Sequence, residues 1–180
     1  VYCLRKGIET TDTQNIGAIL SEITVELKFI DGVQHVFLNG DDVSTEIRLP
    51  DASMAASNVS AIPAVRAFLF DLQRDIASKN NCIMDGRDIG TVVLPNAQVK
   101  IFLTADDTER AMRRYKELQE KGSTVTYQEV LDDLRVRDYN DSHREIAPLK
   151  PAEDSVIVNT TNYTLEESID KIVKTVEEKL

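Results

Sequence analysis

The chain has 180 residues, of which 42% are hydrophobic and 29% are charged; this composition excludes disordered, collagen-like and low-complexity proteins and fits one ordinary domain with a core. Its 21 Lys and Arg against 31 Asp and Glu give a net charge of −10, which argues against a general nucleic-acid-binding surface because such surfaces carry excess cations. Apolar runs are far shorter than the roughly 18 residues of a membrane span, and Cys3 and Cys82 are too few for a disulfide framework, so we expect a reduced, cytoplasmic protein.

The first predicted elements are two helices. Residues 2–4 belong to a helix that ends at Gly7, a residue type common just after helix ends. No N-cap residue precedes this helix, so we expect the sequence to begin inside a larger protein. A second helix is predicted over residues 12–23, where isoleucines recur at helical spacing.

The pattern then changes to strands. Residues 24–29 alternate polar and apolar side chains, Asp31-Gly32 is a hairpin signal, and residues 34–38 continue the extended pattern. After a tight turn at Asn39-Gly40, a third short strand is predicted within residues 43–49, which completes a small antiparallel meander. Two helices are predicted next, over residues 51–60 and 63–78.

The second half of the chain alternates strands and helices, which is typical of an α/β fold with a parallel sheet. Buried strands are predicted at residues 82–84, 99–103 and 155–158. The helices each begin with a capping-box pattern, at Asp106, Thr126 and Thr164.

Common catalytic motifs are missing. The sequence has no Gly-x-Gly-x-x-Gly, Gly-x-Ser-x-Gly or His-Glu-x-x-His, and no Gly-x-x-x-x-Gly-Lys-Ser/Thr phosphate loop. His35 and His143 lie far apart in the sequence and are interpreted as ordinary polar side chains.

Residues 85–91 follow a predicted strand, the position at which parallel sheets bind ligands. Two glycines allow close backbone approach, Arg87 offers two parallel donors to a phosphate, and the aspartates can accept hydrogen bonds. A simple chain-reversing turn explains the same residues equally well.

The helix that begins at Thr126 changes character along one face. Its apolar stripe continues into Arg137, Asp138 and Asp141, with Arg144 nearby. These charges favour a helix that enters a polar cleft, although a solvated pair between Arg137 and Asp141 is the alternative.

Six of the eleven arginines fall between residues 110 and 144. Arg110 and Arg114 are like charges one helical turn apart, which is unfavourable unless an anion lies between them. The cluster favours a polyanionic ligand such as a nucleotide phosphate chain; the alternative is a mixed-charge surface with Glu109 and Glu117.

Long segments of the chain resemble bacterial-type cytidylate kinases, of the nucleoside monophosphate kinase family. They are NGDDVSTEIR, MAASNVSAIPAVR, DGRDIGTVVLPNAQVKIFL, TERAMRRYKELQEKG and RVRDYNDSHREIAPLKPA, in family order. The resemblance implies a P-loop NTPase-like parallel-sheet core, incomplete here, with a small antiparallel CMP-binding insert and a short helical lid. The implied domains are core helices over 1–23, the monophosphate-binding insert over 24–80, and a core over 81–180 with the lid at about 110–137.

The resemblance also implies the reaction, ATP-dependent phosphorylation of CMP or dCMP, with Mg²⁺ entering with ATP and no metal ligands in the protein. The implied partners are these nucleotides only, without nucleic acid or membrane, and we expect a monomer. By similarity, Ser57, Arg66 and Asp88 would recognise cytosine. Arg87 and Arg144 would hold the CMP phosphate, and Arg137 and Asp141 would contact the sugar. The catalytic group would comprise Arg110 and Arg114, near the transferring phosphoryl and ATP, with Arg144.

One family feature is missing. Cytidylate kinases begin with a Gly-rich phosphate loop and then a Ser/Thr-Gly-Ala-x-Tyr-Arg segment, and this sequence would start just after that Tyr-Arg. We therefore expect an N-terminally truncated form whose own ATP binding is an open question. The alternative is a non-catalytic nucleotide-binding module that has lost the loop. A uridylate or shikimate-type kinase is a second rival, against which the antiparallel insert and Asp88 argue.

Overall fold

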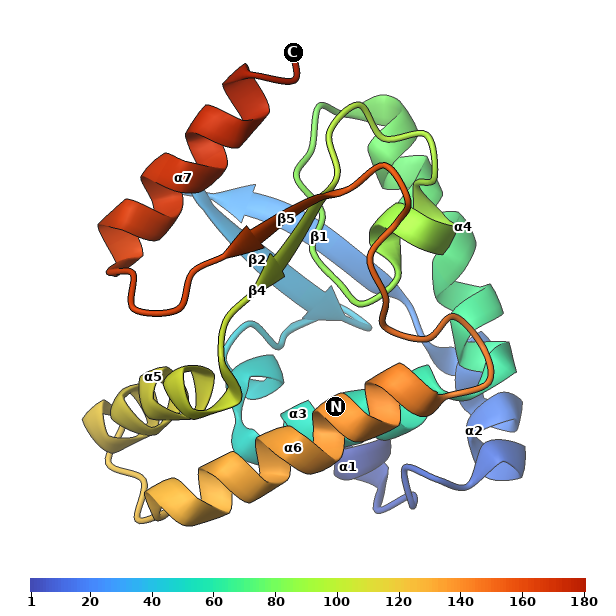
Figure 1. The fold of residues 1–180 in the computed structure, drawn as a ribbon. Helices are drawn as coiled ribbons and strands as arrows, with labels where there is room; N and C mark the ends of the chain where they lie inside the picture. Colours follow the sequence, from blue (N-terminus) through green and yellow to red (C-terminus); the bar gives the residue numbers. More distant parts are fainter. The chain divides into compact units, whose positions relative to one another are not determined.

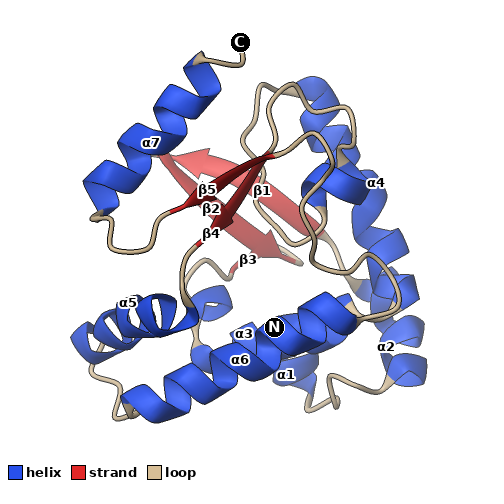
Figure 2. Ribbon diagram, in the orientation of Figure 1, coloured by secondary structure: helices blue, strands red, loops and turns tan.

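The computed structural model describes residues 1–180 and divides the chain into two compact units, Val1–Asn80 and Asn81–Leu180 (Figure 1). Figure 2 shows helices and strands in both units. The first unit contains a small antiparallel sheet and the second a parallel one. The expected α/β fold class is therefore confirmed, whereas the functional domains assigned from the sequence stay predictions.

The first unit opens with two short helices, α1 (Tyr2–Lys6) and α2 (Thr13–Ile19). Gly7 ends α1 in the left-handed conformation with φ 65°, as its position predicts. The helix predicted over 12–23 is shorter than expected, because its last turn tightens into a 3₁₀ helix at Leu20–Glu22 before the chain becomes extended.

The meander consists of β1 (Val25–Ile30), β2 (Val33–Leu38) and β3 (Asp41–Asp42), all antiparallel. Two-residue turns join them, with positive φ at both residues of Asp31-Gly32 and of Asn39-Gly40. The predicted strand at 43–49 is wrong. The tight second turn starts the pairing at Asp41, and Glu46–Arg48 form a 3₁₀ helix.

Helices α3 (Pro50–Ser60) and α4 (Pro63–Lys79) follow, each with proline in its first turn, where the missing N–H costs nothing. Both helices predicted in this region are confirmed. The core of the first unit joins α1, α2 and the start of α4 through buried apolar side chains, namely Cys3, Ile16, Ile62 and Val65.

In the second unit, β4 (Ile101–Thr104) pairs in parallel with β5 (Val156–Asn159). The predicted strand at 82–84 is wrong: the sheet contains only β4 and β5, and Ile83 is fully exposed. An apolar triplet without a hydrogen-bonding neighbour cannot form a strand, and sequence pattern does not reveal the neighbour.

Three helices complete the second unit: α5 (Asp107–Glu120), α6 (Tyr127–His143) and α7 (Leu165–Glu177). The capping boxes of Thr126 with Glu129 and of Thr164 with Glu167 are both formed. The box predicted at Asp106 is not formed: the backbone N–H of Asp106 donates to Thr161 Oγ1, and Glu109 pairs with Arg113. None of these helices combines the length and the apolar character that a membrane span requires.

Candidate functional site

Helix α6 positions the candidate site. Its N-terminal half packs against α5, beside which it lies in Figure 1, through a cluster of Ala111, Leu118, Val130 and Leu131. On its C-terminal half the inward positions are charged, and Asp141 is only 3% exposed. The pair of Arg137 and Asp141 is therefore not the solvated surface pair that the sequence offered as an alternative.

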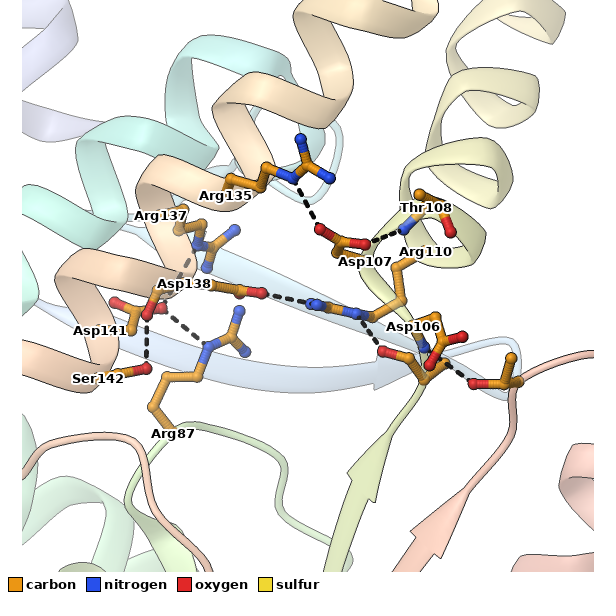
Figure 3. Close-up of polar contacts among 12 residues, drawn as sticks. Arg87, Asp106, Asp107, Thr108, Arg110, Arg135, Arg137, Asp138, Asp141 and Ser142 are labelled. Atoms are coloured by element: carbon orange, nitrogen blue, oxygen red, sulfur yellow. Dashed lines mark hydrogen bonds and ion pairs between the residues drawn. The ribbon is translucent and has the colours of Figure 1, made fainter.

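Asp141 faces arginines of two different segments: it accepts a hydrogen bond from Arg87 and forms an ion pair with Arg137 (Figure 3). Arg87 Nε donates to Asp141 Oδ2 over 3.0 Å, and Arg137 Nε lies 3.7 Å from the same oxygen. The bond from Arg87 joins residues 54 positions apart, so the segment after residue 85 is fastened to the charged face of α6.

Two cations and two anions lie close enough to Arg137 to affect its pKa. Burial lowers its pKa, the guanidiniums of Arg87 and Arg114 lower it further, and the carboxylates of Asp141 and Asp138 oppose the shift. A partly buried cation beside other cations is unfavourable. An anion that binds here would relieve this repulsion and be attracted by the guanidiniums of Arg87, Arg114 and Arg137.

Arg144 ends α6, where the negative end of the helix dipole favours a cation. Its side chain is 7% exposed and lies 3.6 Å from a carboxylate oxygen of Asp88, which is itself 11% exposed. Arg144 Nε also donates to the carbonyl of Ala147, a residue with φ 51°. In this arrangement Arg144 faces Asp88, and Arg87 faces Asp141; whether both arginines hold one phosphate stays a prediction.

The segment that carries Arg87 and Asp88 is a bend without regular secondary structure. It leads into a π-helical turn at Ile89–Val93, in which the carbonyl of Asp88 accepts from the N–H of both Val92 and Val93. A Cβ added at Gly86 would lie 2.8 Å from the side chain of Ile89, which would have to move to make room for it. Such π turns frequently occur at functional sites.

The arginines of α5 each have an acidic neighbour. Arg110 pairs with Asp138 over 2.7 Å, and Arg114 pairs with Glu117 over 2.7 Å. The like charges of Arg110 and Arg114 are therefore balanced separately, without a shared anion between them. Arg113, beside its pair with Glu109, donates to the carbonyl of Thr160.

Ser57 and Arg66 belong to the first unit. Ser57 is buried on α3, and its carbonyl accepts from the hydroxyl of Ser60. Arg66, on α4, donates to the carbonyl of Ser60 over 3.3 Å. Both predicted cytosine-recognising residues of this unit therefore contact the same residue at the junction of the two helices.

The remaining candidates are simpler. His35 lies 2.6 Å from Asp42 and His143 lies 2.9 Å from the carbonyl of Tyr139, both as ordinary polar side chains. No three His, Cys, Asp or Glu residues are grouped so that they could hold a metal ion.

Sequence reasoning missed two features of the site: the bond from Arg87 to Asp141 and the contact of Asp138 with Arg110. The helical periodicity placed Asp138 and Asp141 on one face of the helix, but it could not show that Arg110 and Arg87 lie opposite them. Only a signal of spatial proximity between distant positions could have identified these pairs.

Comparison with known proteins identifies the family. The profile described as Cytidylate kinase matches residues 1–178. The chain is similar to cytidylate kinases of Caldicellulosiruptor bescii (47% identity over 171 residues, 95% of this chain and 76% of the relative) and Lactobacillus johnsonii (45% over 173 residues, 96% and 75%). A third relative, from Pasteurella multocida, is 42% identical over 177 residues, 98% of this chain and 78% of its own length.

These relatives are named as kinases, and none supports the non-catalytic alternative. The chain spans about three quarters of their length. With a profile match along nearly its whole length, the chain belongs to the cytidylate kinase family.

Proposed function

We propose that the charged cluster around Asp141 is the part of the CMP site that holds the phosphate and sugar. The chain is a phosphotransferase of the cytidylate kinase family, which phosphorylates CMP and dCMP with ATP. The observation that carries the proposal is the nearly complete burial of Asp141 between the guanidiniums of Arg87 and Arg137. A buried carboxylate held from two sides is a fixed acceptor, suited to a ribose hydroxyl.

In this assignment Arg87 and Arg144 bind the phosphate of CMP, and Arg137 and Asp141 contact its sugar. Arginine suits the phosphate because its planar fork donates two parallel hydrogen bonds. The pKa of Arg137 is lowered first by burial and then by the charge of Arg87; a phosphate bound nearby would offset that repulsion.

Cytosine recognition is assigned to Ser57, Arg66 and Asp88. An ionised carboxylate only accepts hydrogen bonds, so Asp88 suits the exocyclic amine of cytosine. The contact of Asp88 with Arg144 supports an ionised state before the substrate binds.

The transfer itself needs positioned cations more than covalent chemistry. An oxygen of the CMP phosphate forms a bond to the γ-phosphorus of ATP as the bond to the β-phosphate oxygen breaks, which releases ADP. We assign Arg110, Arg114 and Arg144 to the charge that spreads over the transferring group. Mg²⁺ would enter with ATP and neutralise part of the charge of its phosphates.

We propose further that the enzyme acts as a monomer in the cytoplasm, without nucleic acid or membrane. The net charge of −10 argues against a nucleic-acid surface, and the free thiols of Cys3 and Cys82 suit a reducing compartment.

Calorimetric titration with CMP tests the site, on protein expressed from its complete coding sequence. Arg144→Met and Arg87→Met should each weaken CMP binding about tenfold or more, since each removes a charged hydrogen-bond donor. Arg135→Met is the control. Arg135 lies on α6, the helix that Arg144 ends, but it pairs with Asp107, so this variant should bind CMP normally. A loss below about threefold for both site variants would contradict the assignment.

A further inference from the structure

Two ion pairs of opposite polarity connect α5 and α6. Asp107 and Arg110 lie three residues apart on α5, and Arg135 and Asp138 lie three residues apart on α6. Arg135 Nε donates to Asp107 Oδ2 over 2.7 Å, and an Nη of Arg110 donates to Asp138 Oδ2 over 2.7 Å (Figure 3). The two pairs connect the same helices, but only one contains an arginine assigned to phosphoryl transfer.

The side chain of Arg110 is held at two points. Besides its bond to Asp138, its Nε donates to the carbonyl of Ala105 over 2.9 Å, at the end of β4. These contacts fix the plane of the guanidinium and use two of its N–H groups. A guanidinium carries five N–H donors, so others remain for the oxygens of a ligand.

Asp138 also links Arg110 to the proposed CMP site. It lies three residues before Asp141 on α6, and Asp141 accepts from Arg87. The anchors of Arg110 and Arg87 are therefore less than one helical turn apart, about 4.5 Å along the axis. A single rigid element sets the position of both arginines, which in-line transfer between two phosphates requires.

We infer that Asp138 is a positioning residue for phosphoryl transfer: its carboxylate holds Arg110 at a fixed place relative to Arg87 and Asp141. This inference rests on the proposed function, because it takes Arg110 to act on the transferring phosphoryl group. Asp138 itself contacts neither nucleotide and acts through Arg110.

Steady-state kinetics of Asp138→Asn, in protein expressed from its complete coding sequence, tests the inference. We expect kcat to fall about ten- to a hundredfold, as for a lost charged hydrogen bond. The KM for CMP should change less than about threefold, because Arg87 and Asp141 remain and Asp141 still faces Arg137. Asp138→Glu keeps a carboxylate and should recover part of the kcat. Asp107→Asn breaks the matched ion pair between the same helices and should keep kcat within about twofold.

A double-mutant cycle with Arg110→Gln then separates positioning from general stability. If Asp138 acts through Arg110, Asp138→Asn should not lower kcat further in the Arg110→Gln background. The inference would be overturned if Asp107→Asn lost as much kcat as Asp138→Asn. It would also be overturned if Asp138→Asn lowered kcat in the Arg110→Gln variant as much as in the parent. An unchanged kcat in Arg110→Gln alone would instead overturn the proposed role of Arg110, and with it the inference.

Discussion

Asp88 is the residue on which base selection should depend most. Cytosine presents an amine where uracil presents a carbonyl oxygen, and a carboxylate attracts the first and repels the second. Ser57 can donate or accept, so it discriminates poorly by itself. Asp88→Ala should therefore lower the ratio of kcat/KM for CMP over UMP about ten- to a hundredfold.

The control for this experiment is the reaction with UMP, measured on the same two proteins. If both nucleotides lose activity equally and the ratio is unchanged, Asp88 only stabilises the turn around Ile89–Val93. Its contact with Arg144 gives that outcome a structural basis.

Asp42 shows how local hydrogen bonds make stability depend on pH. The hydroxyl and N–H of Ser44, with the ring of His35, lower its pKa from 3.8 to about 2. A depressed carboxyl pKa stabilises the fold above about pH 4, and this contribution is lost as the pH falls through about 2. Asp42→Asn should therefore be less stable than the parent near pH 6, and the difference should shrink from about pH 4 to about pH 2.

Unfolding midpoints of the parent and of Asp42→Asn across this pH range check the expectation. Carboxyl ¹³C shifts give a direct test. Titration of Asp42 near 3.8 would show that its hydrogen bonds do not favour the ionised form.

At the scale of elements, the helix caps provide a matched set. The hydroxyls of Thr126 and Thr164 accept from the third backbone N–H of their helices, whereas Asp106 makes no side-chain cap. Thr126→Ala and Thr164→Ala should each lower the free energy of unfolding by about 1 kcal/mol, and Asp106→Ala by less. Chemical denaturation measures all three, and an equal loss for Asp106→Ala would contradict the cap assignment.

Local signals predicted the elements well, because each depends on neighbours in sequence. Asp31-Gly32 requires positive φ at two consecutive residues, and the structure has it. The strand at 82–84 failed because pairing depends on a distant neighbour that three apolar residues do not specify. For the same reason the sequence indicated a charged face on α6 but not that Arg87 would contact Asp141.

At the scale of the whole molecule, the boundary between the two units follows α4. Residues 81–85 have no regular secondary structure, and Ile83 among them is fully exposed. Exposed, irregular segments are preferred sites of proteolysis. Thermolysin, which cleaves before large apolar residues, should therefore cut first between Cys82 and Ile83.

Mass spectrometry of early digests should show fragments that correspond to residues 1–82 and 83–180. Ile83→Gly removes the preferred site and should delay this cleavage without changing the fold. A first cut elsewhere, unaffected by the substitution, would contradict the expectation.

The charge of the molecule has opposite signs at two scales. The chain carries −10 overall, yet Arg87, Arg114 and Arg137 lie close enough to affect one pKa. At long range the negative net charge repels an anionic nucleotide, whereas at the site the arginines attract it. Added salt should therefore weaken both the repulsion and the attraction.

Helix α6 also restricts how the chain can change in length. Its packed half and its charged half are separated by three positions, from Leu134 to Arg137. One inserted residue would rotate Asp141 by about 100° away from Arg87; seven would nearly restore its direction but move it about 10.5 Å along the axis, far beyond a 3.0 Å bond. This stretch can therefore accept new side chains, but neither an insertion nor a deletion.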